Sequence, residues 1–384
     1  MPLILMPVLT NQLTSAEFGA LSGFVIYVNL LATFAMFSTN GYVSVKYHKL
    51  DADQFKKDFF LVHILFVISC LLLNFGFYFL GSFGIISVVS DYTYFYPIIT
   101  LLLGLHLLTQ AFFQTSESVN QFVSTKLIVA IFDICVCMAI LVFVSTYDVI
   151  SRPLSWTMGL FISLIFSYRY IARHLIVEIT FFRVKEVALF CIPLVPHVVV
   201  GTLNGFIDKL VVLEKIGVEQ MAHYMAAVYV STAFLILIEP INKVLAPWIF
   251  KNLMVGEVNL VKRYIRIYCL GLTFFSILFA ISGVLVFEYF VPTEYSEAKK
   301  FLPLLVGGCL FQGFYYCRVN ILFFYERNIV ISSISSLVLL INIVLTITLT
   351  NVLGPMGAAS SFLAVNVLMY LFSHHFSERE LARL

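Results

Sequence analysis

Four ionisable side chains lie inside apolar runs of this sequence, and their types could do chemistry there. Glu239 and Lys243 are four residues apart in FLILIEPINKVLAPWIF, so on a helix they share one face. Arg318 lies in GFYYCRVNILFF, and Asp133 lies in VAIFDICVCMAI. Ionised groups are costly within a membrane, so by default they face a protein interior or a wet cavity. We therefore interpret these residues as markers of a transport pathway.

Each candidate also has a structural interpretation, which the sequence leaves open. Glu239 and Lys243 are either a mutually neutralised pair or an acid and a base lining a polar cavity. Pro240 and Pro247 favour the cavity, because prolines are expected to break the helix and free carbonyl groups that need polar neighbours.

Arg318 and Asp133 have the same two kinds of interpretation. Arg318 either extends its long side chain to the membrane interface or offers a permanent planar charge that suits phosphate. Asp133 has no basic residue in its own apolar run, so it is a protonated or partnered structural residue, a proton or sodium relay, or an acceptor for sugar hydroxyls.

Other polar residues are given structural roles. Asp208 and Lys209 fall near the outer end of a predicted helix, where water is close. His63, His106 and His197 are single histidines in apolar helices, which predicts hydrogen-bonded interior residues. The seven cysteines lie in apolar runs without the spacing of a zinc site, so we predict no metal.

Motifs of enzymes are absent from the sequence. It has no phosphate-binding loop, paired zinc motif, nucleophile elbow or extracytoplasmic domain with clustered acids. We therefore expect no catalytic residue, no cofactor and no nucleic-acid partner.

The composition identifies the environment of these residues. The chain has 384 residues, of which 61% are hydrophobic and 11% charged, and this excludes a water-soluble fold. Apolar runs of about 20 residues predict an all-α polytopic membrane protein. Residues 1–10 resemble the second half of a helix whose beginning is missing, so about twelve helices are expected. The full helices are predicted at 18–40, 59–81, 93–114, 122–145, 154–172, 187–208, 222–245, 268–291, 301–324, 329–350 and 356–376.

The basic residues predict the orientation of these helices. Most of the 23 Lys and Arg residues fall in connections on one side, and only Arg152, Lys215, Lys299 and Lys300 fall in connections on the other. Cytoplasmic loops carry the excess of Lys and Arg, so both termini are predicted to be cytoplasmic.

The middle connection and a weak repeat predict two six-helix lobes. The lobes are residues 1–172 and 187–384, with a cytoplasmic linker at 173–186. LTSAEFGALSGF followed by an apolar helix and basic residues is mirrored by IGVEQMAHYMAAV followed by the same pattern. Both copies enter the membrane in the same direction, so the repeat is parallel.

The chain resembles bacterial O-antigen and polysaccharide repeat-unit flippases, the polysaccharide branch of the multidrug/oligosaccharidyl-lipid/polysaccharide exporter superfamily. The resemblance covers essentially the whole chain and is carried by the order and spacing of LTSAEFG (13–19), FIDKLVV (206–212), AHYMAAV (222–228), APWIFK (246–251) and LGPMGAASSFLAVNV (353–367). Families of this kind usually begin some residues before the first loop, so the short beginning of this chain departs from the pattern.

The resemblance implies a flippase in the bacterial inner membrane. Its two lobes would surround a cationic cavity and move polyprenyl-diphosphate-linked oligosaccharides from the cytoplasmic to the periplasmic leaflet by alternating access, for O-antigen, lipopolysaccharide or capsule synthesis. Lys243 and Arg318 are then candidates for the phosphates, and Asp133 and Glu239 for sugar hydroxyls or a coupling ion. Candidate partners are the lipid-linked oligosaccharide, the bilayer, and polymerase and chain-length proteins of the same pathway.

Two other functions remain open from the sequence. A cation-coupled multidrug exporter of the same superfamily would need a cavity of net acidic character. A membrane glycosyltransferase or polymerase would convert lipid-linked sugar into a longer glycan.

Overall fold

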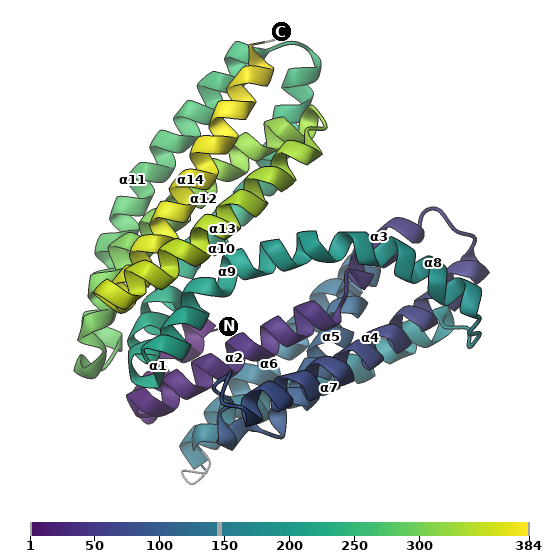
Figure 1. Ribbon diagram of the computed structural model, residues 1–384, viewed down its shortest axis with the longest axis horizontal. Helices are drawn as coiled ribbons and strands as arrows, with labels where there is room; N and C mark the ends of the chain where they lie inside the picture. Colours follow the sequence, from purple (N-terminus) through teal and green to yellow (C-terminus); the bar gives the residue numbers. More distant parts are fainter. Residues whose placement is uncertain (1, 144–147, 383–384) are drawn as a thin grey trace. The chain divides into compact units, whose positions relative to one another are not determined.

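The computed structural model describes residues 2–143 and 148–382, and in these ranges its regular structure is helical. The confirmed fold class is therefore an all-α membrane protein. The α-helices, shown in Figure 1, are α1 (Pro2–Gln12), α2 (Ser15–Ala35), α3 (Thr39–Lys46), α4 (Ala52–Ser82), α5 (Phe95–Thr115), α6 (Val119–Phe143), α7 (Asp148–Ile171), α8 (Phe181–Cys191), α9 (Val195–Lys215), α10 (Val218–Met254), α11 (Val258–Phe290), α12 (Ala298–Phe324), α13 (Asn328–Leu353) and α14 (Pro355–Leu381).

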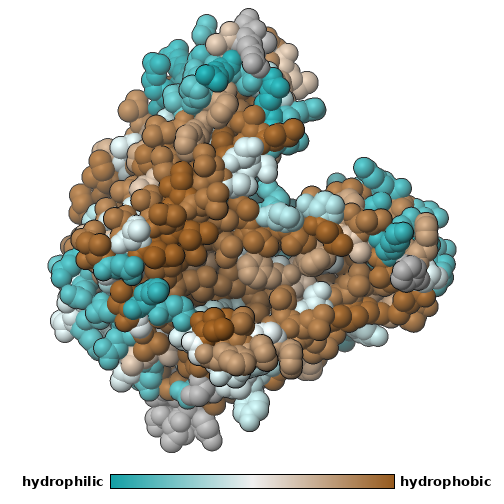
Figure 2. Space-filling model, viewed as in Figure 1, coloured by the Kyte–Doolittle hydropathy of each residue, from teal (hydrophilic) through white to brown (hydrophobic). Residues whose placement is uncertain are grey.

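Within the described ranges, ten helical segments are long and apolar enough to cross a membrane. One of them, Phe182–Lys215, joins α8 and α9 through a short 3-10 turn at Ile192–Leu194. α12 has 27 residues but is not among the ten, because polar residues such as Gln312 and Asn320 lower its hydropathy. Each of the eleven predicted full helices therefore has a counterpart. Figure 2 shows apolar residues along the sides of the helices and hydrophilic residues gathered at helix ends.

The chain divides into two compact units. Unit 1 comprises residues 23–202, and unit 2 comprises residues 2–22 with residues 203–384. The unit boundary falls inside α2 and again inside α9, so both helices contribute to both units. The lobes expected at 1–172 and 187–384 stay a prediction.

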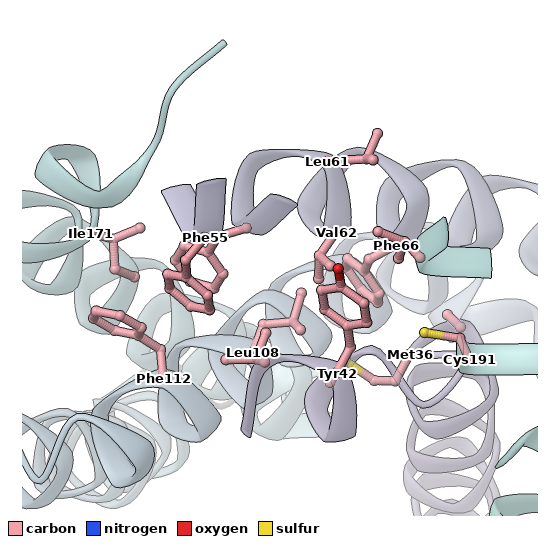
Figure 3. Close-up of a cluster of buried hydrophobic side chains, with 14 of the residues drawn as sticks. Met36, Tyr42, Phe55, Leu61, Val62, Phe66, Leu108, Phe112, Ile171 and Cys191 are labelled. Carbon is pink, nitrogen blue, oxygen red and sulfur yellow. The ribbon is translucent and has the colours of Figure 1, made fainter. Parts of the chain in front are cut away.

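In unit 1, a cluster of buried apolar side chains fixes the end where α3 and α8 lie. α6 packs on α7, and α5 packs on α7 and α4. Aromatic residues of α4 and α5 fill the cluster, with Phe55, Phe59 and Phe112 stacked on one another. Figure 3 shows how Met36 and Tyr42 lie at one edge of this cluster, near Cys191 of α8. Apolar burial on this scale holds the short helix α3 against the spanning helices.

In unit 2, α12 is the central helix. It packs against α14, α10 and α11, and α13 packs on α14. Small residues allow the closest approaches, since a Cβ at Gly308 would collide with the ring of Phe362. α1 packs on α10, and a Cβ at Gly19 would collide with the backbone carbonyl of Val218. This packing places the polar residues of α10 and α12 side by side.

Candidate functional site

The structure places Asp133 in a buried ion pair within unit 1. The guanidinium of Arg152, on α7, donates to Asp133 Oδ1 on α6, and Ser155 Oγ donates to the same oxygen at 3.1 Å. Asp133 is 1% exposed and Arg152 is 7% exposed. The prediction that Arg152 lies in an outside loop was wrong, because α7 begins at Asp148 and includes it. This partner could not be predicted from the residues around Asp133, because it lies on another helix.

Glu239 and Lys243 are exposed on α10 in unit 2. Among the described residues no ion pair joins them to each other or to a third group. Tyr316 of α12 lies close enough to Glu239 to interact with it electrostatically. The two charges therefore have no ion-pair partner within the described residues.

Pro240 and Pro247 do not interrupt α10, which runs through both. The expectation that they break the helix was wrong. Each proline still lacks an N–H, so the carbonyl groups four residues earlier, those of Ile236 and Lys243, lose their intrahelical donor. The stretch around Lys243 thus combines a cation with a free backbone acceptor.

Arg318 of α12 is held by a carboxylate of α14. Its Nη1 donates to Glu378 Oε1 at 2.6 Å, and Lys262 Nζ of α11 lies 3.1 Å from Glu378 Oε2. Two cations therefore share one carboxylate, which leaves this cluster with a net positive charge. The sequence did not point to Glu378, because it lies sixty residues from Arg318.

A row of polar side chains connects α10 to α12. Asn320 Nδ2 donates to Asn242 Oδ1 at 2.8 Å, and Gln312 Nε2 donates to the hydroxyl of Tyr316 at 3.0 Å. Asn242 was not predicted as a site residue. Its polar side chain in an apolar run, one residue before Lys243, could have indicated it. These groups lie on the same pair of helices as Glu239 and extend its polar surface.

An apolar groove lies along α10 beside Lys243. Its volume is about 530 Å³, and its lining is Pro240, Ile241, Val244, Leu245, Trp248 and Tyr264. Lys243 directly precedes Val244 in the helix, but it is not one of the residues that line the groove.

The other predicted residues mostly keep structural roles. Asp208 is buried, accepts from the Tyr224 hydroxyl at 2.6 Å, and pairs with Lys209 at 3.1 Å. His63 and His106 are hydrogen-bonded inside unit 1, as predicted. His197 is exposed on α9, so its predicted interior position was wrong.

Charged residues dock the segment after α7 onto α4. Arg183 Nη1 donates to Asp58 Oδ1 at 2.8 Å, and the Tyr42 hydroxyl donates to Asp58 Oδ2 at 2.8 Å. Burial, with help from Asp58, raises the pKa of Tyr42 well above its ordinary value. Lys57 pairs with Glu178, and its hydrogen bond lowers the pKa of that carboxyl. None of these partners was predicted, because they are far apart in sequence.

The chain belongs to the family described as polysaccharide biosynthesis protein, whose model matches residues 1–253. No curated protein matches the chain significantly. Together with the ten spans, the family places this chain among multi-pass membrane proteins.

Solved structures with the same fold are transporters and a flippase. One is an inward-facing multidrug resistance transporter of the MATE family and MOP superfamily, with a TM-score of 0.72 and 12% identity over 98% of this chain and 93% of that chain. Another is the lipid II flippase MurJ in an inward closed conformation, with a TM-score of 0.64 and 15% identity over 95% of this chain and 86% of that one. An outward-facing MATE family transporter gives a TM-score of 0.64 and 10% identity over 98% and 90%. The TM-scores establish a common fold despite these low identities.

Proposed function

We propose that this protein is a flippase that moves polyprenyl-diphosphate-linked oligosaccharides from the cytoplasmic to the periplasmic leaflet of a bacterial inner membrane by alternating access. The observation that carries the proposal is Lys243, an exposed cation in a spanning helix with no ion-pair partner among the described residues. A diphosphate cannot cross hydrocarbon without compensating charge, and an unpaired ammonium supplies it.

The surroundings of Lys243 suit the rest of such a lipid. The groove formed by α10 and Tyr264 is apolar and open, which fits an isoprenoid chain whose diphosphate lies at Lys243. Arg318 and Lys262 offer a second cationic cluster, and the row from Asn242 to Gln312 offers amides to sugar hydroxyls. The family description supports this class of substrate, and the fold is shared with a lipid II flippase as well as with MATE family transporters.

The test is transport by the purified chain in proteoliposomes loaded with a fluorescent undecaprenyl-diphosphate oligosaccharide. We expect wild type to move the label to the other leaflet and Lys243→Met to lower the rate by about 10-fold or more, as expected for loss of a charge-assisted contact. The matched control is Lys251→Met, which removes a lysine from the last turn of the same helix.

Three results would contradict the proposal. A wild type that leaves the label in place would do so, and so would a wild type that lengthens the glycan, which indicates a polymerase. Equal rates for Lys243→Met and wild type would show that this cation does not bind the phosphates.

Glu239 favours a second candidate, a cation-coupled multidrug exporter. It is an exposed acid in a spanning helix with no ion-pair partner among the described residues, and such an acid can bind a proton or an organic cation. In this case Glu239→Gln abolishes ethidium export from the same liposomes, and the lipid-linked sugar is not moved.

A further inference from the structure

A polar cavity lies within unit 1, and neither Asp133 nor Arg152 lines it. Its volume is about 410 Å³, within the range of roughly 300–1,000 Å³ that small-molecule sites occupy. It lies between the C-terminal turns of α5 and the first turns of α6, and α2, α3 and α9 complete its wall. Its lining includes Met36, His106, Gln110, Gln114, Phe122 and Lys126.

Gln110 provides an unused acceptor in this wall. It is 6% exposed, its Nε2 donates to Thr125 Oγ1, and its Oε1 is buried without a partner among the described residues. The orientation of the amide is determined by Thr125, whose hydroxyl donates to the carbonyl of Gln121 at 2.8 Å and so must accept from Gln110. A buried acceptor without a donor costs free energy, unless a ligand supplies the donor.

His106 provides a second acceptor through a similar chain of bonds. Ser163 Oγ donates to the carbonyl of Thr125 at 3.2 Å and lies 3.2 Å from His106 Nδ1. Because the hydroxyl proton of Ser163 is donated to the Thr125 carbonyl, Ser163 Oγ accepts a hydrogen bond from Nδ1–H of His106. In the neutral ring Nε2 then carries no proton and is an acceptor. Two acceptors on neighbouring turns of α5 can therefore accept hydrogen bonds from a ligand with several hydroxyl or amide donors.

The charges around the cavity exclude a cation as the ligand. None of its lining residues is an Asp or a Glu, and Lys126 is close enough to act electrostatically on His106. Lys126 Nζ is 4.3 Å from the ring centroid of Phe122, which places an aromatic face and a cation at the same wall. Amide, imidazole and aromatic groups beside one cation, without an acid, match a neutral or acidic sugar.

We infer that this cavity is a sugar-binding subsite that takes one residue of the oligosaccharide through Gln110, His106 and Gln114. The inference rests on the proposed function, because it assigns the sugar of that substrate to unit 1. Met36 belongs both to the cavity wall and to the buried cluster of Figure 3, so the wall is anchored in packed structure.

The experiment measures dissociation constants for the full chain in nanodiscs by calorimetry. The probes are undecaprenyl diphosphate, the same lipid carrying a short oligosaccharide, and tetraphenylphosphonium as an organic cation. We expect wild type to bind the glycosylated lipid more tightly than the bare lipid. Gln110→Met should weaken binding of the glycosylated lipid by about 3–10-fold, the loss of one neutral hydrogen bond, and leave the bare lipid unchanged.

Gln114→Leu serves as a second variant, because Gln114 is exposed at the cavity wall and its loss does not disturb packing. Gln121→Leu is the control, since this glutamine lies on α6 outside the lining. If Gln110→Met and Gln114→Leu both keep the preference for the glycosylated lipid, the subsite is overturned and the proposed function stands. If wild type binds neither lipid, both are overturned. If wild type binds tetraphenylphosphonium and Gln110→Met does not, the cavity binds organic cations and the sugar assignment is overturned.

Discussion

The intramembrane charges of the two units differ in how they are compensated. In unit 1, Asp133 and Arg152 are buried and satisfy each other. In unit 2, Glu239 and Lys243 are exposed on α10 and have no ion-pair partner within the described residues. The desolvation of a buried ion pair is compensated by the attraction between its two charges, so a ligand that bound either charge would have to break the pair. The comparison favours a structural role for Asp133 and supports our proposal that Lys243 binds the ligand.

The largest effect is expected from breaking the buried pair. Arg152→Met leaves the Asp133 carboxylate buried without a counter-charge, which should lower the free energy of unfolding by about 3–5 kcal/mol. The measurement is reversible unfolding in mixed micelles, with Lys243→Met as the variant that should leave stability unchanged. The double variant Asp133→Leu/Arg152→Met should recover most of the loss. Equal stability of Arg152→Met and wild type would contradict a structural role for this pair.

An intermediate effect is expected at the carboxylate shared by Arg318 and Lys262. Glu378→Gln removes the negative charge between two cations, so it should cost no more than about 1 kcal/mol of stability, because the group is partly exposed. It should also strengthen binding of undecaprenyl diphosphate a few-fold if Arg318 contacts phosphate. Glu380→Gln, whose carboxylate pairs with Arg327 at 3.0 Å, is the control on the same helix. Unchanged or weaker binding by Glu378→Gln would remove Arg318 from the phosphate site.

The smallest effect concerns a charge outside the spanning helices. The pKa of Glu178 is lowered from 4.5 by its hydrogen bond from Lys57. Because the folded pKa is depressed, the contact stabilises the docked segment above pH 4.5 and is lost as pH falls through the lower folded value. Hydrogen exchange at the Ile176 amide, which bonds to the carbonyl of Lys56, should be a few-fold faster in Glu178→Gln than in wild type at pH 7. The difference between the two should shrink as pH falls below 4.5 and Glu178 becomes protonated in the folded protein. A difference that does not change with pH would show that the charge of Glu178 does not contribute to docking.

The helices were predictable from sequence and most partners of the charged residues were not. Apolar length determines a spanning helix locally, so helices such as α13 and α14 lie within a few residues of their predicted bounds. The pairing of Asp133 with Arg152, or of Arg318 with Glu378, depends on which helices pack together, and periodicity within one helix does not contain that information. That Lys243 has no ion-pair partner among the described residues could not be predicted either, because it also depends on which helices pack against α10. Gln110 was missed because a single glutamine in an apolar helix has no distinctive spacing.

The low hydropathy of α12 has a consequence for how the protein enters the membrane. A helix that carries Gln312, Arg318 and Asn320 partitions poorly into lipid alone, yet α12 is surrounded by α10, α11 and α14 in the folded unit. Since α14 is synthesised after α12, the nascent helix must wait at the translocation channel or beside α10 until its last partner emerges. Biogenesis of the C-terminal helices is therefore cooperative, and a chain that stops before α14 is expected to leave α12 uninserted and exposed to quality-control proteases.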